Sequence, residues 1–323
     1  MRILGTGSYL PNKIVSNDDL SKVVETSDEW ISSRTGIKTR HISEGETSYE
    51  LGSKAAKLAL EDAGMDANDI DLIIFATITS DSPLPSSACM VQKQIGAVNA
   101  TCFDITAACS GFLFALNTAN AYLVSGMYRN ILVIGSETLS RMVNWHDRTT
   151  CVLFGDGAGA AVVTADFSKA FYSVTGSDGF KGSVLTGGRT LFKNLCYGSE
   201  LDSIFTDDYF MKMDGQEVFK FAVTKVPECI KQVLDKSGKT VDDIEYYILH
   251  QANVRIISSV AKRLGIEEDK IPVNLHNYGN TSAASIPILL DEMNKGGKLT
   301  SGSKIVLSGF GGGLTWGATY MEI

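Results

Sequence analysis

The sequence predicts an α/β protein made of two similar halves. Apolar runs of strand length alternate along its 323 residues with segments whose apolar residues recur at helical spacing, which is typical of sheets covered by helices. Residues 60–74 resemble residues 234–248, and residues 131–135 resemble residues 305–309, in both cases 174 positions further on. Because chance similarity would rarely give one offset twice, we predict a duplicated unit, with halves at residues 1–165 and 166–323.

In the first half, a strand is expected at residues 2–10 and short helices start at Asn17, a plausible cap, and at residues 26–31. Residues 48–64 carry the apolar face of a buried helix, and the continuous apolar run at residues 71–77 is typical of a strand buried on both faces. The other elements expected here are a helix at 86–96, a strand before Cys109, a helix that ends at 125–126 and a strand at 130–135.

The second half repeats this alternation. A buried strand is predicted at residues 246–249, followed by a helix that starts at residues 251–253. The offset of 174 residues places His250 opposite Ala76 and Cys109 opposite Ala283. The ends of equivalent strands would then face each other across a pseudo-twofold axis, and strand ends are where open α/β sheets bind ligands.

Cys109 is the first candidate site residue, because it lies between a strand and a buried helical run. The first N–H groups of a helix are free and its N-terminus is positive, so we expect this position to lower the pKa of the thiol. Small neighbours, among them Ala108 and Gly111, would leave the sulfur open to a substrate. A buried cysteine that packs as a small hydrophobic residue is the alternative, and this stretch alone leaves both open.

Among the four histidines, His250 is the best site candidate, because it follows a buried strand and precedes a helix. His41 and His146 lie among charged residues, which favours the surface. His276 is ambiguous, either a loop residue or a competitor of Asn280 for a catalytic role. Asn280 in turn opens a run of small residues and could simply cap a helix.

Composition limits the partners. The net charge of −8 argues against nucleic acid, and no apolar run approaches the roughly 20 residues of a membrane helix. With no signal-peptide pattern, cytoplasm is the expected location. The six cysteines form no C-x-x-C pair and no zinc-type cluster, so free thiols and no metal site are expected.

Several motifs together resemble one family. They are residues 106–112 around Cys109, residues 155–160, residues 250–253, residues 279–285 and the glycine loop at 310–313. In the same order and over nearly the whole chain, they recur in the β-ketoacyl-acyl-carrier-protein synthase III family, the condensing enzymes that start bacterial fatty-acid synthesis. The resemblance implies a thiolase-like fold of αβαβα layers built from two duplicated halves, and a homodimer.

The resemblance also implies the catalytic roles. Cys109 would take an acyl group from acyl-CoA as a thioester, and His250 and Asn280 would bind the thioester carbonyl of malonyl-acyl carrier protein during loss of CO2. The backbone N–H groups of Cys109 and Gly312 would form the oxyanion hole. Neither a metal nor a redox cofactor is implied, since acyl-CoA and malonyl-acyl carrier protein are substrates.

Binding residues are implied in the same way. Trp30 and Arg148 correspond to the pair that sandwiches adenine of CoA, and Arg34 would contact phosphate or adenine. The pantetheine arm would lie against Gly215, Phe219 and Asn253.

The helix after His250 carries Arg255, Lys262 and Arg263 within about a third of its circumference. They could receive an acidic acyl carrier protein, although a solvated helix face is the common meaning of such a pattern. Leu84 matches a position that reaches into the partner subunit's acyl pocket, and its small side chain hints at room for longer or branched primers.

Two other functions stay open at this point. A related thiolase-fold acyltransferase of secondary metabolism would share Cys109, His250 and Asn280 but use another acceptor. A non-catalytic acyl-CoA or carrier-binding protein is disfavoured by the complete set of the three residues.

Overall fold

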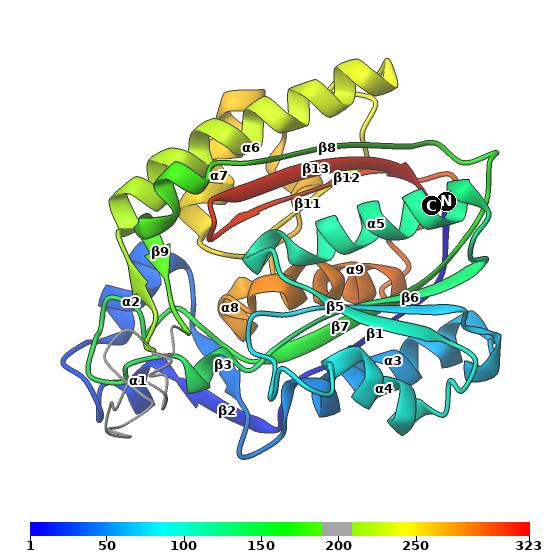
Figure 1. Cartoon of the computed structure of the whole chain (residues 1–323). Helices are drawn as coiled ribbons and strands as arrows, with labels where there is room; N and C mark the ends of the chain where they lie inside the picture. Colours follow the sequence, from blue (N-terminus) through cyan, green and yellow to red (C-terminus); the bar gives the residue numbers. More distant parts are fainter. Residues whose placement is uncertain (189–208) are drawn as a thin grey trace.

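Two sheets and three helical layers make up the molecule. The computed structural model describes residues 1–188 and 209–323. Figure 1 shows five layers stacked in the order helix, sheet, helix, sheet, helix, so the predicted αβαβα architecture is confirmed. Within the described residues, no helix is long and apolar enough to cross a membrane.

The first sheet is five-stranded, in the order β1-β7-β6-β4-β5. Its strands are β1 (Arg2–Tyr9), β4 (Leu72–Ala76), β5 (Thr101–Ile105), β6 (Asn130–Glu137) and β7 (Gly157–Thr164). β4 runs parallel to both β5 and β6, whereas β7 is antiparallel to β6 and β1. This leaves β5 as an edge strand of the sheet.

The second sheet has the order β11-β12-β13-β8. Its strands are β8 (Phe171–Ser177), β11 (Tyr246–Leu249), β12 (Lys304–Gly311) and β13 (Thr315–Glu322). Each sheet is thus drawn from one side of residue 165. On this basis we propose that residues 1–165 and 166–323 are the duplicated halves.

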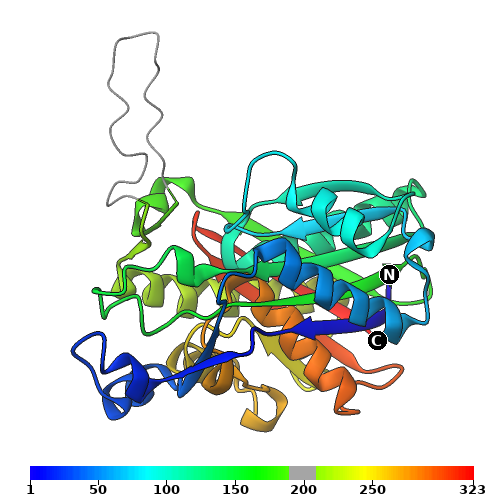
Figure 2. The same cartoon turned by 90° about the horizontal axis from the view of Figure 1, so that it is seen from below.

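Three helical layers cover the sheets. The outer face of the first sheet carries α3 (Ser48–Ala63) and α4 (Ser87–Ile95), onto which Figure 2 looks. Between the sheets lie α5 (Gly111–Ser125) and α9 (Ser285–Lys295), and the outer face of the second sheet carries α6 (Gly215–Ser237) and α7 (Val254–Leu264). Alternate residues of β6 serve two layers: Ile131 and Val133 pack toward α5 and α9, and Leu132 and Ile134 pack toward α3.

Smaller elements complete the chain. They are β2 (Lys13–Ser16), paired with β3 (Thr39–Ile42); α1 (Asn17–Leu20); α2 (Asp28–Thr35); α8 (Leu275–Tyr278); β9 (Leu185–Thr186), paired with β10 (Lys212–Met213); and the 3-10 helices η1 (Ala67–Asp69), η2 (Ala108–Ser110), η3 (Leu139–Arg141), η4 (Gly179–Val184), η6 (Glu268–Lys270) and η7 (Ser282–Ala284).

Two irregular turns obey the repeat offset. η2 starts at Ala108 and η7 at Ser282, 174 residues later, and each leads directly into a helix between the sheets. These two residues are also the non-glycine positions with positive φ, 45° for Ala108 and 49° for Ser282. Left-handed backbone of this kind is costly for a side chain and often marks functional sites.

Two capping predictions were wrong. Ser16, not Asn17, caps α1, because its hydroxyl accepts the N–H of Asp19. Asn280 does not cap α9, which starts only at Ser285 and has no side-chain cap. In both cases the turn before the helix takes a path that the sequence pattern does not reveal.

Candidate active site

The Cys109 side chain lies in η2, between β5 and α5, and is only 8% exposed. The second half approaches it closely. A Cβ atom added to Gly311, the last residue of β12, would lie 2.6 Å from the backbone nitrogen of Cys109. Only glycine lets β12 pass here, so the glycine loop and the cysteine are held against each other.

Two cavities meet at Cys109. The smaller, of about 140 Å³, is lined by Cys109, His250 and Asn280. The larger, of about 640 Å³, lies on the other side of η2 and is lined by apolar residues such as Leu139 and Met142. The sulfur therefore stands between a passage that carries polar groups and a roomier, mainly apolar chamber.

His250 follows β11, as predicted, and is buried at the wall of the smaller cavity. Its Nδ1 lies 2.7 Å from Oγ of Ser285, and its ring packs edge-on against Phe310. Burial lowers the pKa of His250 to about 3, so the ring is neutral at physiological pH. Since Ser285 engages Nδ1, Nε2 is the ring nitrogen available to a ligand.

Asn280 is fixed through both backbone and side chain. Its backbone N–H donates to Leu153 (2.8 Å), and its side-chain Oδ1 accepts the N–H of Ser282 (2.8 Å). This leaves the Nδ2 amine as the end of the side chain available to a ligand in the smaller cavity. Cys109, His250 and Asn280, predicted from separate stretches, thus lie around one cavity.

The predicted effect of position on the thiol was wrong in direction. Burial raises the pKa of Cys109 to about 12, and the charge of Glu137 acts in the same direction. The N-terminus of α5 would favour a thiolate, but removal of the sulfur from water outweighs it. The resting side chain is therefore a neutral thiol, which needs a proton acceptor before it can act as a nucleophile.

The proposed CoA residues form a group at the entrance. Trp30 lies between two guanidinium groups, 4.7 Å from Arg34 and 5.2 Å from Arg148. Nδ2 of Asn253 donates to the backbone oxygen of Arg34 (3.1 Å), which joins this group to the smaller cavity. Gly215 and Phe219 line the same cavity.

The three basic residues of α7 are all exposed. Arg255 lies in the first turn, and its guanidinium stands 5.8 Å from the Phe219 ring, at the mouth of the smaller cavity. Lys262 and Arg263 lie in the last turn, about 10–12 Å further along the helix by its rise per residue. His276 is exposed and lines neither cavity, so it does not compete with Asn280.

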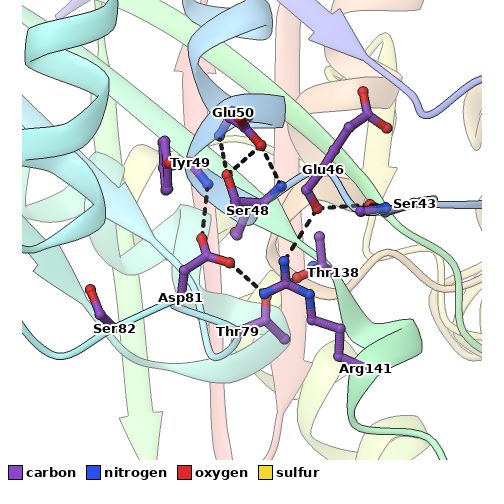
Figure 3. A network of polar contacts seen from close by, with 12 residues as sticks. Ser43, Glu46, Ser48, Tyr49, Glu50, Thr79, Asp81, Ser82, Thr138 and Arg141 are labelled. Atoms are coloured by element: carbon purple, nitrogen blue, oxygen red, sulfur yellow. Dashed lines mark hydrogen bonds and ion pairs between the residues drawn. The ribbon is translucent and has the colours of Figure 1, made fainter.

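Leu84 is 86% exposed and lines neither cavity of its own chain. It lies in the loop of residues 77–86 that follows β4. Figure 3 shows how this loop is anchored: Asp81 pairs with Arg141 of η3 and accepts the N–H of Tyr49 at the start of α3. The anchor holds Leu84 away from the body of the molecule.

Sequence reasoning missed Glu137, the last residue of β6. Its carboxyl group is fully buried and close enough to Cys109 to raise the pKa of the thiol. A signal was present, since Glu137 follows directly on a buried apolar strand, the same pattern that singled out His250. Ser282, which lies between Glu137 and Cys109, gave no such signal among the small residues around it.

Comparisons with known proteins agree with this geometry. The family model described as 3-oxoacyl-[acyl-carrier-protein] synthase III matches residues 103–179, and the model of its C-terminal part matches residues 234–323. The beta-ketoacyl-[acyl-carrier-protein] synthase III of Clostridium acetobutylicum is 51% identical over 100% of this chain and 98% of its own. That of Clostridium novyi is also 51% identical, over 100% and 98%.

Solved structures give the same answer. The crystal structure of 3-oxoacyl-[acyl-carrier-protein] synthase III from Aquifex aeolicus is 44% identical, with a TM-score of 0.92 over 100% of this chain and 99% of that one. A priming beta-ketosynthase from the R1128 polyketide pathway is 35% identical, with a TM-score of 0.92 over 100% and 96%.

Fold and site together define a thiolase-like acyltransferase. Within that class, the chain belongs to the β-ketoacyl-[acyl-carrier-protein] synthase III family. Both the predicted family and the predicted fold are confirmed.

Proposed function

We propose that Cys109 takes an acyl group from acyl-CoA and passes it to malonyl-acyl carrier protein in a decarboxylative condensation. The observation that carries this proposal is the position of the sulfur between two cavities. The larger, apolar chamber suits an acyl chain bound to sulfur. The smaller cavity, with His250 and Asn280, suits the arriving thioester.

In the condensation step, Nε2 of His250 and Nδ2 of Asn280 hold the malonyl thioester oxygen. Loss of CO2 places negative charge on that oxygen, and the two neutral groups stabilise it by hydrogen bonding. The resulting carbanion attacks the acyl-cysteine. The backbone N–H groups of Cys109 and Gly312 are proposed to hold the oxyanion formed at the acyl carbon, and both residues line the larger cavity.

No metal or redox cofactor is needed for this reaction, because decarboxylation drives it. In residues 1–188 and 209–323, no group of three histidine, cysteine or acidic side chains is arranged to hold a metal ion. We propose a cytoplasmic enzyme.

A homodimer is part of the proposal. The edge strand β5 has one free side, and it lies next to the exposed apolar loop residue Leu84 in the chain order of the sheet. A second copy pairing along β5 would cover this edge, and its Leu84 would reach the acyl chamber of the first. Arg255, Lys262 and Arg263 are proposed to receive the acidic carrier protein beside the cavity mouth.

A polyketide-priming role is the second candidate, because one similar structure is a priming beta-ketosynthase. The two candidates share the acyl-cysteine and differ in the acceptor carrier protein and the primer.

Intact-mass spectrometry tests the proposal. The protein is incubated with acetyl-, butyryl- and isobutyryl-CoA and then chased with malonyl-acyl carrier protein. We expect a mass gain that is absent in Cys109→Ser and lost on the chase as β-ketoacyl carrier protein appears. Labelling without discharge would point to another acceptor. No labelling by any primer would contradict the proposed reaction.

The Trp30 stack gives a second prediction. Trp30→Ala is expected to raise KM for acyl-CoA about tenfold, since loss of a cation–π contact costs about 0.5–2 kcal/mol. The KM for an acyl-pantetheine thioester, which lacks the adenine, should not change. Steady-state kinetics with both donors checks this, and an equal rise for both would argue against adenine stacking at Trp30.

A further inference from the structure

Glu137 is a buried carboxyl group without a cationic partner among the described residues. It is fully buried at the end of β6. Its Oε2 accepts hydrogen bonds from the hydroxyl groups of Thr79 (2.6 Å) and Thr77 (3.1 Å) and from the N–H of Ile78 (3.1 Å). Three neutral donors hold this oxygen in place, but they do not neutralise its charge.

The other oxygen faces the active site. The Ser282 hydroxyl donates to Oε1 of Glu137 (3.1 Å) and is also hydrogen-bonded to the Cys109 thiol. A continuous chain of hydrogen bonds therefore runs from the sulfur through Ser282 to the carboxyl group. Ser282 is placed there by left-handed backbone, φ 49°, a cost that a purely structural serine would not require.

We propose that Ser282 passes the proton of the Cys109 thiol to Glu137 when the cysteine is acylated, and returns it when the cysteine is released. This inference rests on the proposed acyl transfer at Cys109. Ser282 touches the reacting sulfur, whereas Glu137 acts through Ser282 and is a positioning residue that also stores the proton.

The protons balance over the cycle. In the first step the S–H bond of Cys109 breaks, a C–S bond to the acyl group forms, Glu137 gains the proton, and the CoA thiolate takes a proton from solvent. In the second step CO2 leaves malonyl, the carbanion forms a C–C bond, and the C–S bond to Cys109 breaks. Glu137 then returns its proton to the sulfur, so the cycle consumes one proton from solvent.

The transfer also suits a buried site electrostatically. With the proton on sulfur or on Glu137, the pair carries one negative charge, so no new charge is created in the low-dielectric interior. Burial raises the pKa of Glu137 to about 7, which makes it a proton acceptor matched to physiological pH. The strongly lowered pKa of His250 makes that ring a poorer acceptor.

Other charged groups lie on the elements packed around Glu137. Cys109 faces it from η2 and is the titratable group that senses its charge. Asp81 and Arg141 pair with each other beyond Thr79, as Figure 3 shows. Asp156 is buried separately, against the hydroxyl and N–H of Ser140. The pH profile of the thiol is therefore expected to follow Glu137.

The test measures acyl-enzyme formation from acyl-CoA by rapid quench and intact mass, between pH 6 and 9.5. In the unaltered protein the rate should rise to about pH 7 and then level off. Glu137→Gln should be about 10²-fold slower at neutral pH and gain about tenfold per pH unit, as hydroxide takes over from the carboxylate. Ser282→Ala should be slowed similarly, and the double variant no more than the slower single one.

Alkylation of Cys109 by iodoacetamide tests the link without acyl-CoA. Its rate should level off near pH 7 in the unaltered protein and in Ser282→Ala, but keep rising in Glu137→Gln. Asp156→Asn, which also removes a buried carboxylate, is the control and should leave both profiles unchanged.

Two results would overturn the proposal: a Glu137→Gln variant that matches the unaltered protein, or one slowed equally at every pH with an unchanged alkylation profile. Failure of the unaltered protein to form any acyl-enzyme would instead overturn the proposed function, and the alkylation profiles would still report on Glu137.

Discussion

Asn280→Asp is expected to slow condensation about 10³-fold while acyl-enzyme formation changes less than about tenfold. Aspartate keeps the acceptor oxygen for the N–H of Ser282, so η7 should stay in place. The exchange replaces the Nδ2 donor by a carboxylate oxygen. Loss of one donor to a developing oxyanion costs about 10²–10³-fold, and a like charge beside it adds to that cost.

Single-turnover experiments separate the two steps. Acylation is measured with acyl-CoA alone, and condensation by mixing purified acyl-enzyme with malonyl-acyl carrier protein. Asn277→Asp is the matched control, since the same change is made three residues earlier on an exposed side chain. Equal slowing of both steps by Asn280→Asp would show that Asn280 supports the site as a whole rather than the decarboxylation.

The second large effect is expected from Gly135→Ala. A Cβ atom at Gly135 would lie 2.3 Å from the backbone oxygen of Ala283 and 2.8 Å from its carbonyl carbon. Both atoms belong to η7, so the contact can be relieved only by moving the turn that carries Ser282. We expect a loss of about 2 kcal/mol in the free energy of unfolding, together with reduced activity.

The repeat provides the control for this prediction. Gly309 lies 174 residues after Gly135, at the equivalent place in β12. A Cβ atom there would meet only side-chain atoms, at 3.4–3.5 Å, which is ordinary contact distance. Gly309→Ala should therefore unfold within about 1 kcal/mol of the unaltered protein. Denaturant titration of both variants checks the difference, and similar stabilities would contradict the inferred close approach at Gly135.

Much of the fold could be predicted because its strands are buried on both faces. The apolar run at 71–77 became β4 (Leu72–Ala76), and the run at 246–249 became β11, with the same bounds. Such runs are bounded by polar residues, so their ends are visible in the sequence. The caps at Asn17 and Asn280 failed because side-chain contacts in a turn depend on its backbone path.

Site chemistry was less accessible to sequence reasoning. Strand ends pointed to Cys109 and His250, because the topology of a repeated α/β unit brings such ends together. The direction of the thiol pKa could not be inferred in the same way, since it depends on how completely the second half covers the sulfur. Glu137 was missed for a related reason: its chemistry comes from burial and from a serine 145 residues away in the sequence.

The smaller cavity has a consequence for the timing of the reaction. It is a narrow approach to Cys109, and it also holds the faces of His250 and Asn280. On the proposed function, both thioesters must use it, each with a pantetheine arm of the same length. The two donors then queue for a single doorway, and free CoA must depart before the carrier protein can deliver its cargo. The acyl chamber behind the sulfur serves as the waiting room that keeps the first substrate's acyl group while the doorway is cleared.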